Sequence, residues 1–262
     1  MDSLDGQVAL VTGAGRGIGA GIALELATRG ARVALMGRTE STLEESAELI
    51  RVRTATQVSV HPGDVTDEHS VEKVIDSVLQ RHARIDVLVN NAGIVDQAQF
   101  LDIGLAGWNA VIATNLTGVF LMTQRVARRM RTTGGGSVVN IASIDAYGTD
   151  GPQASYTAAK AGVVGLTKAA ATELAPIKVR VNSVSPGWVH TKMVEEFISA
   201  DAMKYLLGKF ARVPMQRLVE INEVAHAVAF LAGPGSSAIT GIDVPVDCGT
   251  LSNLFVFETL PT

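Results

Sequence analysis

The chain has 262 residues, of which 47% are hydrophobic and 18% are charged, and its formal net charge is −4. A chain of this length can bury one large core, and its slight acidity provides no basic field to attract nucleic acid. No apolar run reaches the length of a membrane span, about eighteen residues, and the single cysteine, Cys248, rules out an internal disulfide, so we expect a cytoplasmic protein without a membrane partner.

Strand-like and helix-like segments alternate along the chain, and no linker, repeat or low-complexity stretch divides it. The predicted strands cover residues 7–12, 31–37, 57–61, 85–90, 136–142, 178–184 and 242–246. The predicted helices cover residues 17–29, 41–52, 68–82, 107–132, 153–174, 191–209 and 220–232. Because the strands are apolar without alternation, we expect both faces of a parallel sheet to be buried. The sequence therefore predicts one α/β domain over residues 1–262, with a doubly wound, seven-stranded parallel sheet and helices on both faces.

A glycine-rich turn joins the first strand to the first helix, as in a dinucleotide-binding, Rossmann-like unit. The turn reads Gly13-Ala14-Gly15-Arg16-Gly17-Ile18-Gly19. Its pattern is G-x-x-x-G-x-G and not the common G-x-G-x-x-G, because Ile18 stands where the third glycine would be. Glycines let the backbone approach a pyrophosphate, and the helix amino terminus offers it free N–H groups. We therefore predict a dinucleotide cofactor at this turn.

The end of the second strand indicates which nicotinamide cofactor is bound. An NAD enzyme of this fold has a carboxylate there, which accepts from the ribose 2′-hydroxyl. This chain instead has Gly37, Arg38 and Thr39 at that position. Arg38 and Arg16 provide two guanidinium groups, and these suit a 2′-phosphate better than a hydroxyl. The sequence therefore favours NADP(H), and the nearby Glu40 keeps NAD open as the alternative.

A tyrosine and a lysine near the start of the helix at 153–174, with a serine thirteen residues ahead of the tyrosine, indicate proton transfer at an oxygen atom. Tyr156 and Lys160 are four residues apart and share a helix face, so the ammonium is expected to favour the tyrosinate. Ser143 would hold a carbonyl or alcohol oxygen beside Tyr156. A Y-x-x-x-K pattern also arises by chance, so a packed tyrosine beside a solvated lysine is the alternative.

Taken together, these motifs resemble the short-chain dehydrogenase/reductase family over essentially the whole chain. The matching residues, in the family's order, are Thr12 to Gly19, Asp64-Val65, Asn90 to Gly93, Asn115, Ser143, Tyr156, Lys160, Pro186-Gly187 and Thr191. The resemblance implies a reductase or dehydrogenase that moves hydride between nicotinamide C4 and a ketone or secondary alcohol, with Tyr156 as general acid/base. The 3-oxoacyl-carrier-protein reductase and secondary alcohol dehydrogenase branch is the most similar. A non-catalytic dinucleotide-binding protein is the alternative of another class.

The resemblance also implies roles for residues elsewhere on the ligand crevice. Asp64, followed by Val65, would accept from the adenine amino group, or it belongs to a helix N-cap region. Asn115 would hold a water that relays protons from Lys160, or it is a purely structural amide. Lys160 would also bond the nicotinamide ribose. The remaining residues implied in cofactor binding are Asn91, Ala92, Gly93, Pro186, Gly187, Val189 and Thr191.

Substrate specificity is expected in loops above the crevice, chiefly a lid over residues 188–213. The candidate substrate-lining residues are Ile94, Asp145, Tyr147, Trp188, Met193 and Phe197. They predict a largely apolar carbonyl or alcohol substrate, and Asp145 either contacts a donor on it or is solvated. No metal site is predicted. Helices 107–132 and 153–174 are apolar on more than one face, and the segment 251–257 is apolar, so with the family resemblance we expect a homotetramer.

Overall fold

The computed structural model of the protein describes residues 3–191 and 213–253. Seven parallel strands form one sheet in the order β3-β2-β1-β4-β5-β6-β7. The strands are β1 Val8–Thr12, β2 Arg32–Gly37, β3 Val58–Pro62, β4 Val87–Asn90, β5 Gly136–Ile141, β6 Val179–Pro186 and β7 Asp243–Val246. The order reverses between β1 and β4, which is the topological switch point of a doubly wound sheet. The predicted fold is confirmed.

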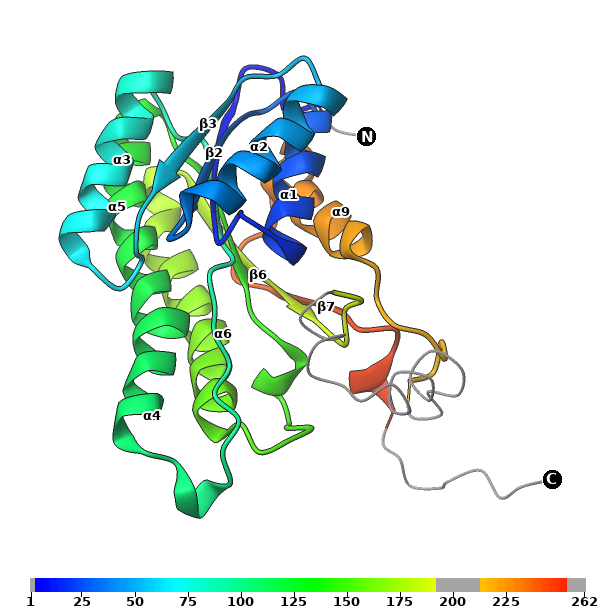
Figure 1. Ribbon diagram of the computed structural model, residues 1–262. Coiled ribbons are helices and arrows are strands. Elements are labelled where there is room, and N and C mark those ends of the chain that lie inside the picture. The colour runs from blue at the N-terminus through cyan, green and yellow to red at the C-terminus, as the bar shows by residue number, and fades with distance from the viewer. Residues whose placement is uncertain (1–2, 192–212, 254–262) are drawn as a thin grey trace.

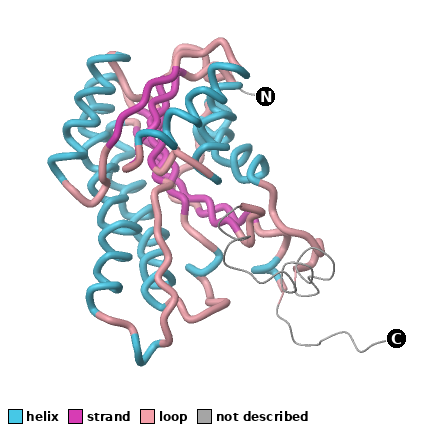
Figure 2. The backbone as a smooth tube through the Cα atoms, in the orientation of Figure 1, coloured by secondary structure: helices cyan, strands magenta, loops and turns pink. Residues whose placement is uncertain are grey.

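Helices cover both faces of the sheet (Figure 1). Those described are α1 Gly17–Thr28, α2 Glu40–Arg53, α3 Glu68–His82, α4 Leu105–Ile112, α5 Gly118–Thr133, α6 Ala154–Leu174 and α9 Ile221–Ala232. One core joins α1, α2 and α9 to the sheet, and a second joins α3, α5 and α6 to its other face. The tube in Figure 2 shows the strands running between these two helical layers.

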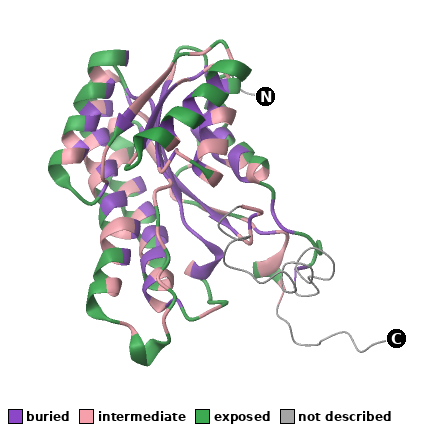
Figure 3. Ribbon diagram, in the orientation of Figure 1, coloured by how far each residue is buried: buried purple, intermediate pink, exposed green. Residues whose placement is uncertain are grey.

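Successive residues of strand β1 point alternately into the two cores. Ala9 and Val11 of β1 point into the first core, whereas Val8 and Leu10 point into the second. Every residue of β1 is buried, as the unbroken apolar pattern predicted. Figure 3 shows the buried sheet between helices whose outer faces are exposed.

The predicted helix at 107–132 is one continuous helical run with a defect in its middle. Between α4 and α5 lies a π-helical segment, Ala113–Thr117, which contains Asn115. Segments of this kind occur mostly as single turns, frequently at functional sites. The wider turn seats the buried Asn115 amide against the loop after β4, where it finds its partners.

By length and composition alone, the run Leu105–Thr133 could cross a membrane, and 28% of its most apolar window is buried. We expected no apolar stretch as long as a membrane span, and that expectation is corrected for this run. Polar residues interrupt the run, but its mean hydropathy is still high enough for a membrane span. Its second half, α5, packs on the sheet through Met122, Val126 and Met130. Arg125 of α5 also pairs with Glu72 of α3 at 3.0 Å. The run therefore belongs to the helical layer of this fold.

The remaining predicted boundaries agree with the observed ones to within a few residues. The predicted helix at 191–209 lies outside the described residues except for Thr191. The same holds for most of the lid at 188–213, and for residues 254–257 of the late apolar segment.

Candidate active site

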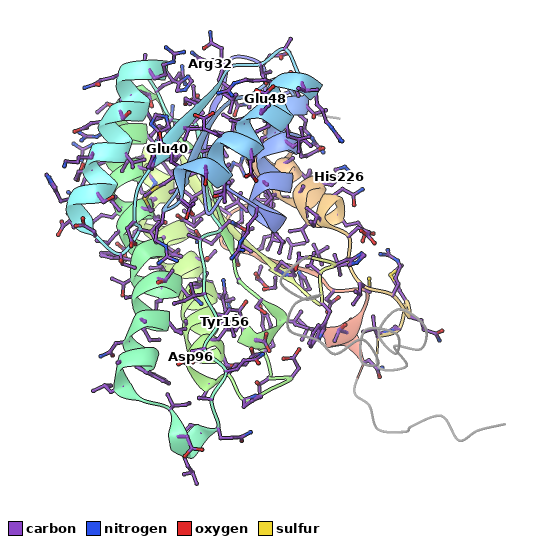
Figure 4. The ribbon with its side chains drawn as sticks, viewed as in Figure 1. Arg32, Glu40, Glu48, Asp96, Tyr156 and His226 are labelled. Carbon is purple, nitrogen blue, oxygen red and sulfur yellow. The ribbon has the colours of Figure 1, made fainter. Side chains whose placement is uncertain are left out.

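The residues singled out in the sequence gather at the carboxyl ends of the strands. Gly13, Gly37, Asn91, Ser143 and Gly187 each follow or end a different strand of the sheet. Tyr156 and Lys160 approach from the first two turns of α6, where Figure 4 labels the tyrosine. In an open parallel sheet this edge is where ligands bind.

The glycine-rich turn is held open by side chains from the next strand of the sheet. Gly13 has a φ of +64°, and a Cβ there would lie 2.9 Å from Ala92 Cα. Asn91 Nδ2 donates to the carbonyls of Thr12 and Gly13 over 3.0 and 3.1 Å. The Thr12 hydroxyl accepts from the backbone N–H groups of Asn91 and Ala92. These bonds fix the backbone of the turn directly ahead of α1, the kind of helix amino terminus at which phosphate groups bind in proteins.

The end of β2 lies against this turn. A Cβ on Gly15 would meet the hydroxyl of Thr42, in the first turn of α2. Arg16 and Arg38 are exposed, and neither guanidinium has a hydrogen bond or ion pair with a described residue. Thr39 is the N-cap residue of α2 but makes no side-chain cap bond. Two exposed arginines and a helix amino terminus without a side-chain cap therefore occur together at the carboxyl end of β2.

Asp64 closes a local turn. Its Oδ1 accepts from the backbone N–H of Thr66 over 2.9 Å and from the Thr66 hydroxyl over 2.8 Å. The N-cap residue of α3 is Asp67, which accepts from the N–H of His69. Asp64 thus lies ahead of the helix and does not cap it. Val65 is buried, against Gly118 at the start of α5.

Ser143, Tyr156 and Lys160 meet beyond the end of β5. Ser143 is buried, Lys160 is 4% exposed, and Tyr156 is half-buried. The tyrosine lies within hydrogen-bonding reach of Ser143. Lys160 Nζ lies 5.4 Å from the centre of the Tyr156 ring and donates to the carbonyl of Ile141 over 2.7 Å. Lys160 is therefore not solvated, and the chance alternative for this pair is wrong.

The predicted effect of Lys160 on Tyr156 is not found in this structure. Burial raises the pKa of the Tyr156 phenol above its ordinary value, and the charges of Asp145 and Asp150 raise it further. Burial also lowers the pKa of Lys160, to about 8. The Tyr156 phenol therefore keeps its proton at pH 7.

Asn115 acts on the loop after β4. Its Oδ1 accepts from the N–H of Ile94 over 2.9 Å, and its Nδ2 donates to the Ile94 carbonyl over 2.8 Å. The side chain is fully buried. These contacts support the structural reading of this amide, which fixes the backbone of the half-buried Ile94 beside the site.

The segment after β6 is held against β7. The N–H of Gly187 donates to the Val246 carbonyl over 2.9 Å, and a Cβ on Gly187 would lie 2.9 Å from Asp247 Cα. Val189 is buried and bridges Val219. Pro186 ends β6, and Thr191 is the last described residue before the gap.

The other substrate-lining candidates differ in how far they are buried and in which partners they have. Asp145 is buried and bonded to Ser143, so it is not solvated. Tyr147 is 54% exposed, and its hydroxyl donates to Asp243 Oδ2 over 2.9 Å. Trp188 is half-buried and bonds the Asp150 carboxylate. Met193 and Phe197 lie outside the described residues.

The roles of three residues in this site were not predicted from the sequence, although Thr12 belongs to the glycine-rich motif that matches the family. The Thr12 hydroxyl links β1 to the loop after β4, because it accepts two backbone hydrogen bonds from that loop. Asp150 and Gln153 form a polar cluster with Asp145 and Trp188. Acidic residues in a turn usually indicate a solvated loop. The one signal in the sequence was that two carboxylates, Asp145 and Asp150, follow Ser143 within seven residues. No group of three metal-ligating side chains occurs within residues 3–191 and 213–253.

A family model described as enoyl-(acyl carrier protein) reductase matches residues 13–250. A 3-oxoacyl-[acyl-carrier-protein] reductase of Synechocystis sp. is 39% identical over 250 residues, which are 95% of this chain and 98% of the relative. A short-chain type dehydrogenase/reductase structure from Mycobacterium marinum is 37% identical, with a TM-score of 0.90 over 96% of this chain and 98% of its own. A candidate 2-deoxy-D-gluconate 3-dehydrogenase from Agrobacterium tumefaciens, solved with bound NADP, is 34% identical, with a TM-score of 0.87 over 96% and 98%.

Proposed function

The chain belongs to the short-chain dehydrogenase/reductase family of oxidoreductases, and on that premise we propose that it is an NADP(H)-dependent carbonyl reductase or alcohol dehydrogenase. The nicotinamide, when bound, supplies or accepts the hydride at C4. The observation that carries the proposal is the meeting of Ser143, Tyr156 and Lys160 in one buried place at the ligand-binding edge of the sheet.

Each of these side chains has a part in the reaction. Tyr156, neutral at pH 7, gives its proton to the oxygen of a ketone as the carbonyl carbon is reduced, and takes one back in the oxidation of an alcohol. Ser143 holds that oxygen beside the phenol. Lys160, buried and anchored on Ile141, binds the nicotinamide ribose and keeps a positive charge under the phenol. Placed acids of this kind contribute about 10²–10⁴-fold in rate.

The choice of NADP(H) over NAD(H) rests on three features at the end of β2. Gly37 replaces the carboxylate that a 2′-hydroxyl needs, and Arg16 and Arg38 are exposed without protein partners. The amino terminus of α2 adds uncapped N–H groups. Glu40, exposed in the first turn of α2, is the residue on which an NAD enzyme would have to rely.

The other cofactor contacts follow from the same placement. Asp64 and Val65 would border the adenine, and the turn from Asn91 to Gly93 would pass the adenosine ribose. Pro186, Gly187, Val189 and Thr191 would line the nicotinamide side. Asp64 and Val65 follow β3 at one edge of the sheet, Asn91 to Gly93 follow the central strand β4, and the second group follows β6 toward the other edge. A cofactor bound in this way would extend across the carboxyl ends of these strands.

The substrate is a ketone or secondary alcohol. The relatives named above include one reductase of acyl-carrier-protein thioesters and one candidate sugar-acid dehydrogenase, so the family name alone does not choose between apolar and polyhydroxylated substrates. Ile94 in the loop after β4 and Trp188 after β6 are half-buried and offer apolar surface at the carboxyl edge of the sheet, and the predicted lid at 188–213 would complete the pocket. We therefore infer a largely apolar ketone.

Assembly as a homotetramer with two-fold symmetry belongs to the same proposal, as does a place in the reducing cytosol. Apolar side chains on and before α4–α5 are open to solvent in the single chain, among them Leu105 at 73% and Phe120 at 42% exposed. A long helix that is apolar outside as well as inside is suited to packing against a second copy.

The proposal is tested by following NADPH absorbance over a panel of aryl ketones, β-keto esters, β-ketoacyl thioesters and sugars. Consumption of NADPH with at least one carbonyl, lost in Tyr156→Phe, is the expected result. A chain that binds NADPH but reduces no member of the panel, and oxidises none of the matching alcohols, would instead be a dinucleotide-binding protein without catalysis.

A further inference from the structure

Ser143 and Asp145 hydrogen bond to each other in both directions. The Ser143 hydroxyl donates to Asp145 Oδ2 over 2.9 Å, and the backbone N–H of Asp145 donates to Ser143 Oγ over 3.1 Å. Both residues are buried, with 6% and 8% of their surfaces exposed. An ionised carboxylate can only accept, so the serine is the donor in the first contact. The one proton of Ser143 is then directed at Asp145 and not at an oxygen beside Tyr156.

Asp145 does not stand alone, because Asp150 adds a second carboxyl group within hydrogen-bonding reach. Gln153 Nε2 donates to Asp150 Oδ1 over 2.7 Å, and the Trp188 side chain bonds the same carboxylate. Asp150 is exposed whereas Asp145 is buried. The pair therefore connects Ser143, inside the site, with solvent at its rim.

We propose that Asp145 is a positioning residue, and that the proton it shares with Asp150 decides whether Ser143 donates a hydrogen bond to a ketone or accepts one from an alcohol. The inference rests on the proposed function, in which Ser143 holds the reacting oxygen beside Tyr156.

The two states follow from the donor count of a hydroxyl, which has one proton and two lone pairs. When Asp145 is ionised, Ser143 donates its proton to the carboxylate, and the N–H of Asp145 occupies one of its lone pairs. The one lone pair that remains can accept from the O–H of an alcohol. When a proton enters from solvent through Asp150, the Asp145 carboxyl donates to Ser143 Oγ, and the serine proton turns to a carbonyl oxygen. No covalent bond to carbon changes, and one proton is gained or lost by the pair.

The groups around the pair favour such sharing near neutral pH. Burial raises the pKa of Asp145, and partial desolvation of the Asp150 carboxyl together with the charge of Asp145 raises the pKa of Asp150 to about 6. The titratable groups that face Asp145 from α6 are Tyr156 and Lys160.

The neighbouring strands β6 and β7 each carry one charged residue, and each of these has hydrogen-bond partners of its own. β6 has one charged residue, Arg180, and its guanidinium bonds the carbonyls of Leu231 and Gly233 at the end of α9. β7 contributes Asp243, which accepts from Tyr147 and from Ser183.

The test measures binding in two complexes that cannot react, a ketone on the enzyme with NADP⁺ and the matching alcohol on the enzyme with NADPH. Neither ligand should itself titrate, and the range runs from about pH 5 to about pH 8, across the ionisation of the pair. We expect the ketone to bind about tenfold more weakly at the upper pH, and the alcohol about tenfold more tightly, which is the effect of one hydrogen bond.

Three variants separate this role from a merely structural one. Asp145→Asn cannot titrate, so both dissociation constants should become independent of pH. Asp150→Asn removes the neighbouring negative charge, so the change should move to lower pH. Asp76→Asn is the matched control, because it removes one carboxylate on α3 that forms only an exposed ion pair with Arg129. It should behave as the wild type.

Several outcomes overturn the inference. The inference is wrong if the two dissociation constants of the wild type do not vary with pH. It is also wrong if Asp145→Asn retains the pH dependence of the wild type. If Asp145→Asn does not fold, the direction of the shift in Asp150→Asn decides alone. A chain that turns over no carbonyl or alcohol contradicts the proposed function and this inference with it, whereas turnover with pH-independent binding contradicts the inference only.

Discussion

The ammonium of Lys160 donates to the backbone carbonyl of Ile141 over 2.7 Å, joining the second turn of α6 to the last residue of β5. The bond holds a buried charge at a fixed place below the Tyr156 ring, 5.4 Å from its centre. Burial disfavours the charged form of Lys160, so this side chain lowers the free energy of unfolding at neutral pH. An expensive buried charge at a ligand-binding edge is typical of a functional group.

Replacing Lys160 with methionine should therefore stabilise the protein while abolishing its activity. Burial lowers the pKa of Lys160 from 10.5 to about 8, so the unfolded chain binds more protons than the folded one between these values. The wild type gains stability from this group as pH rises through that window. Lys160→Met should raise the free energy of unfolding at pH 7. The difference between the variant and the wild type should disappear above about pH 10, where the lysine is neutral in both the folded and the unfolded chain. Urea unfolding at both pH values measures it, with the exposed Lys168→Met as control; a destabilised variant at pH 7 would contradict the argument.

Tyr156→Phe should remove nearly all turnover, by about 10²–10⁴-fold, because only the proton donor is lost. The ring and its packing remain, so folding and NADPH binding should be unchanged. Steady-state kinetics and a fluorescence titration of NADPH measure the two effects. If the variant keeps a tenth of the wild-type rate or more, Tyr156 is not the acid.

The cofactor preference should follow the two arginines at the end of β2. Charge-assisted hydrogen bonds contribute roughly 1.5–3 kcal/mol each, so two of them imply a preference for NADPH on the order of a hundredfold or more. Gly37→Asp with Arg38→Ile should reverse the order, because the new carboxylate accepts from a 2′-hydroxyl and repels a 2′-phosphate. The measurement is kcat/KM for both nicotinamides. A wild type that uses NADH as well as NADPH would show that Glu40 or another group governs this end.

Acid should weaken the fold through a pair of buried histidines between β3 and α3. His82 and His61 both bond the Ser59 hydroxyl, over 2.7 and 2.8 Å. Burial, with help from the charge of Arg32, lowers the pKa of His82 from 6.5 to about 4. The unfolded chain then binds the extra proton, so stability is lost as pH falls through this window.

His82→Phe should reduce that loss, since a phenyl ring of similar size carries no proton. Thermal unfolding at pH 7 and at about pH 4.5 measures the slope. The exposed His69→Gln on α3 is the control and should retain the wild-type slope. An unchanged slope in His82→Phe would assign acid lability to other groups, such as His61.

The proposed tetramer should depend on the exposed apolar face of α5. Phe120→Glu places a charge on a side chain that is 42% exposed in the single chain, so a monomer tolerates it and an apolar interface does not. Light scattering should give a tetramer mass for the wild type and a smaller mass for the variant. Thr132→Glu, on an exposed position of the same helix, is the control. A wild-type monomer at micromolar concentration would contradict the assembly outright.

The strands, the helices and the glycine-rich turn could be read from the sequence because they depend on neighbours in the chain. Val87 to Val89 are apolar without alternation, and that pattern is enough to predict a strand buried on both faces. The spacing of Tyr156 and Lys160 likewise placed both on one helix face. Ser143 could be added only through the resemblance to a family, since no local rule links it to a tyrosine thirteen residues away.

The tertiary structure decided what those groups do to one another. Proton affinity depends on desolvation and on charges that arrive from distant segments, so the pKa of Tyr156 is raised where the sequence alone suggested lowering. The π-helical turn at Asn115 and its bonds to Ile94 are equally invisible locally. Asp145 lies two residues from Ser143 in the sequence, yet its burial and its partnership with Asp150 and Trp188 exist only once the turn before α6 and the end of β6 pack together. Chain neighbours determine which elements form, whereas burial, which the whole fold sets, determines which atoms hold protons.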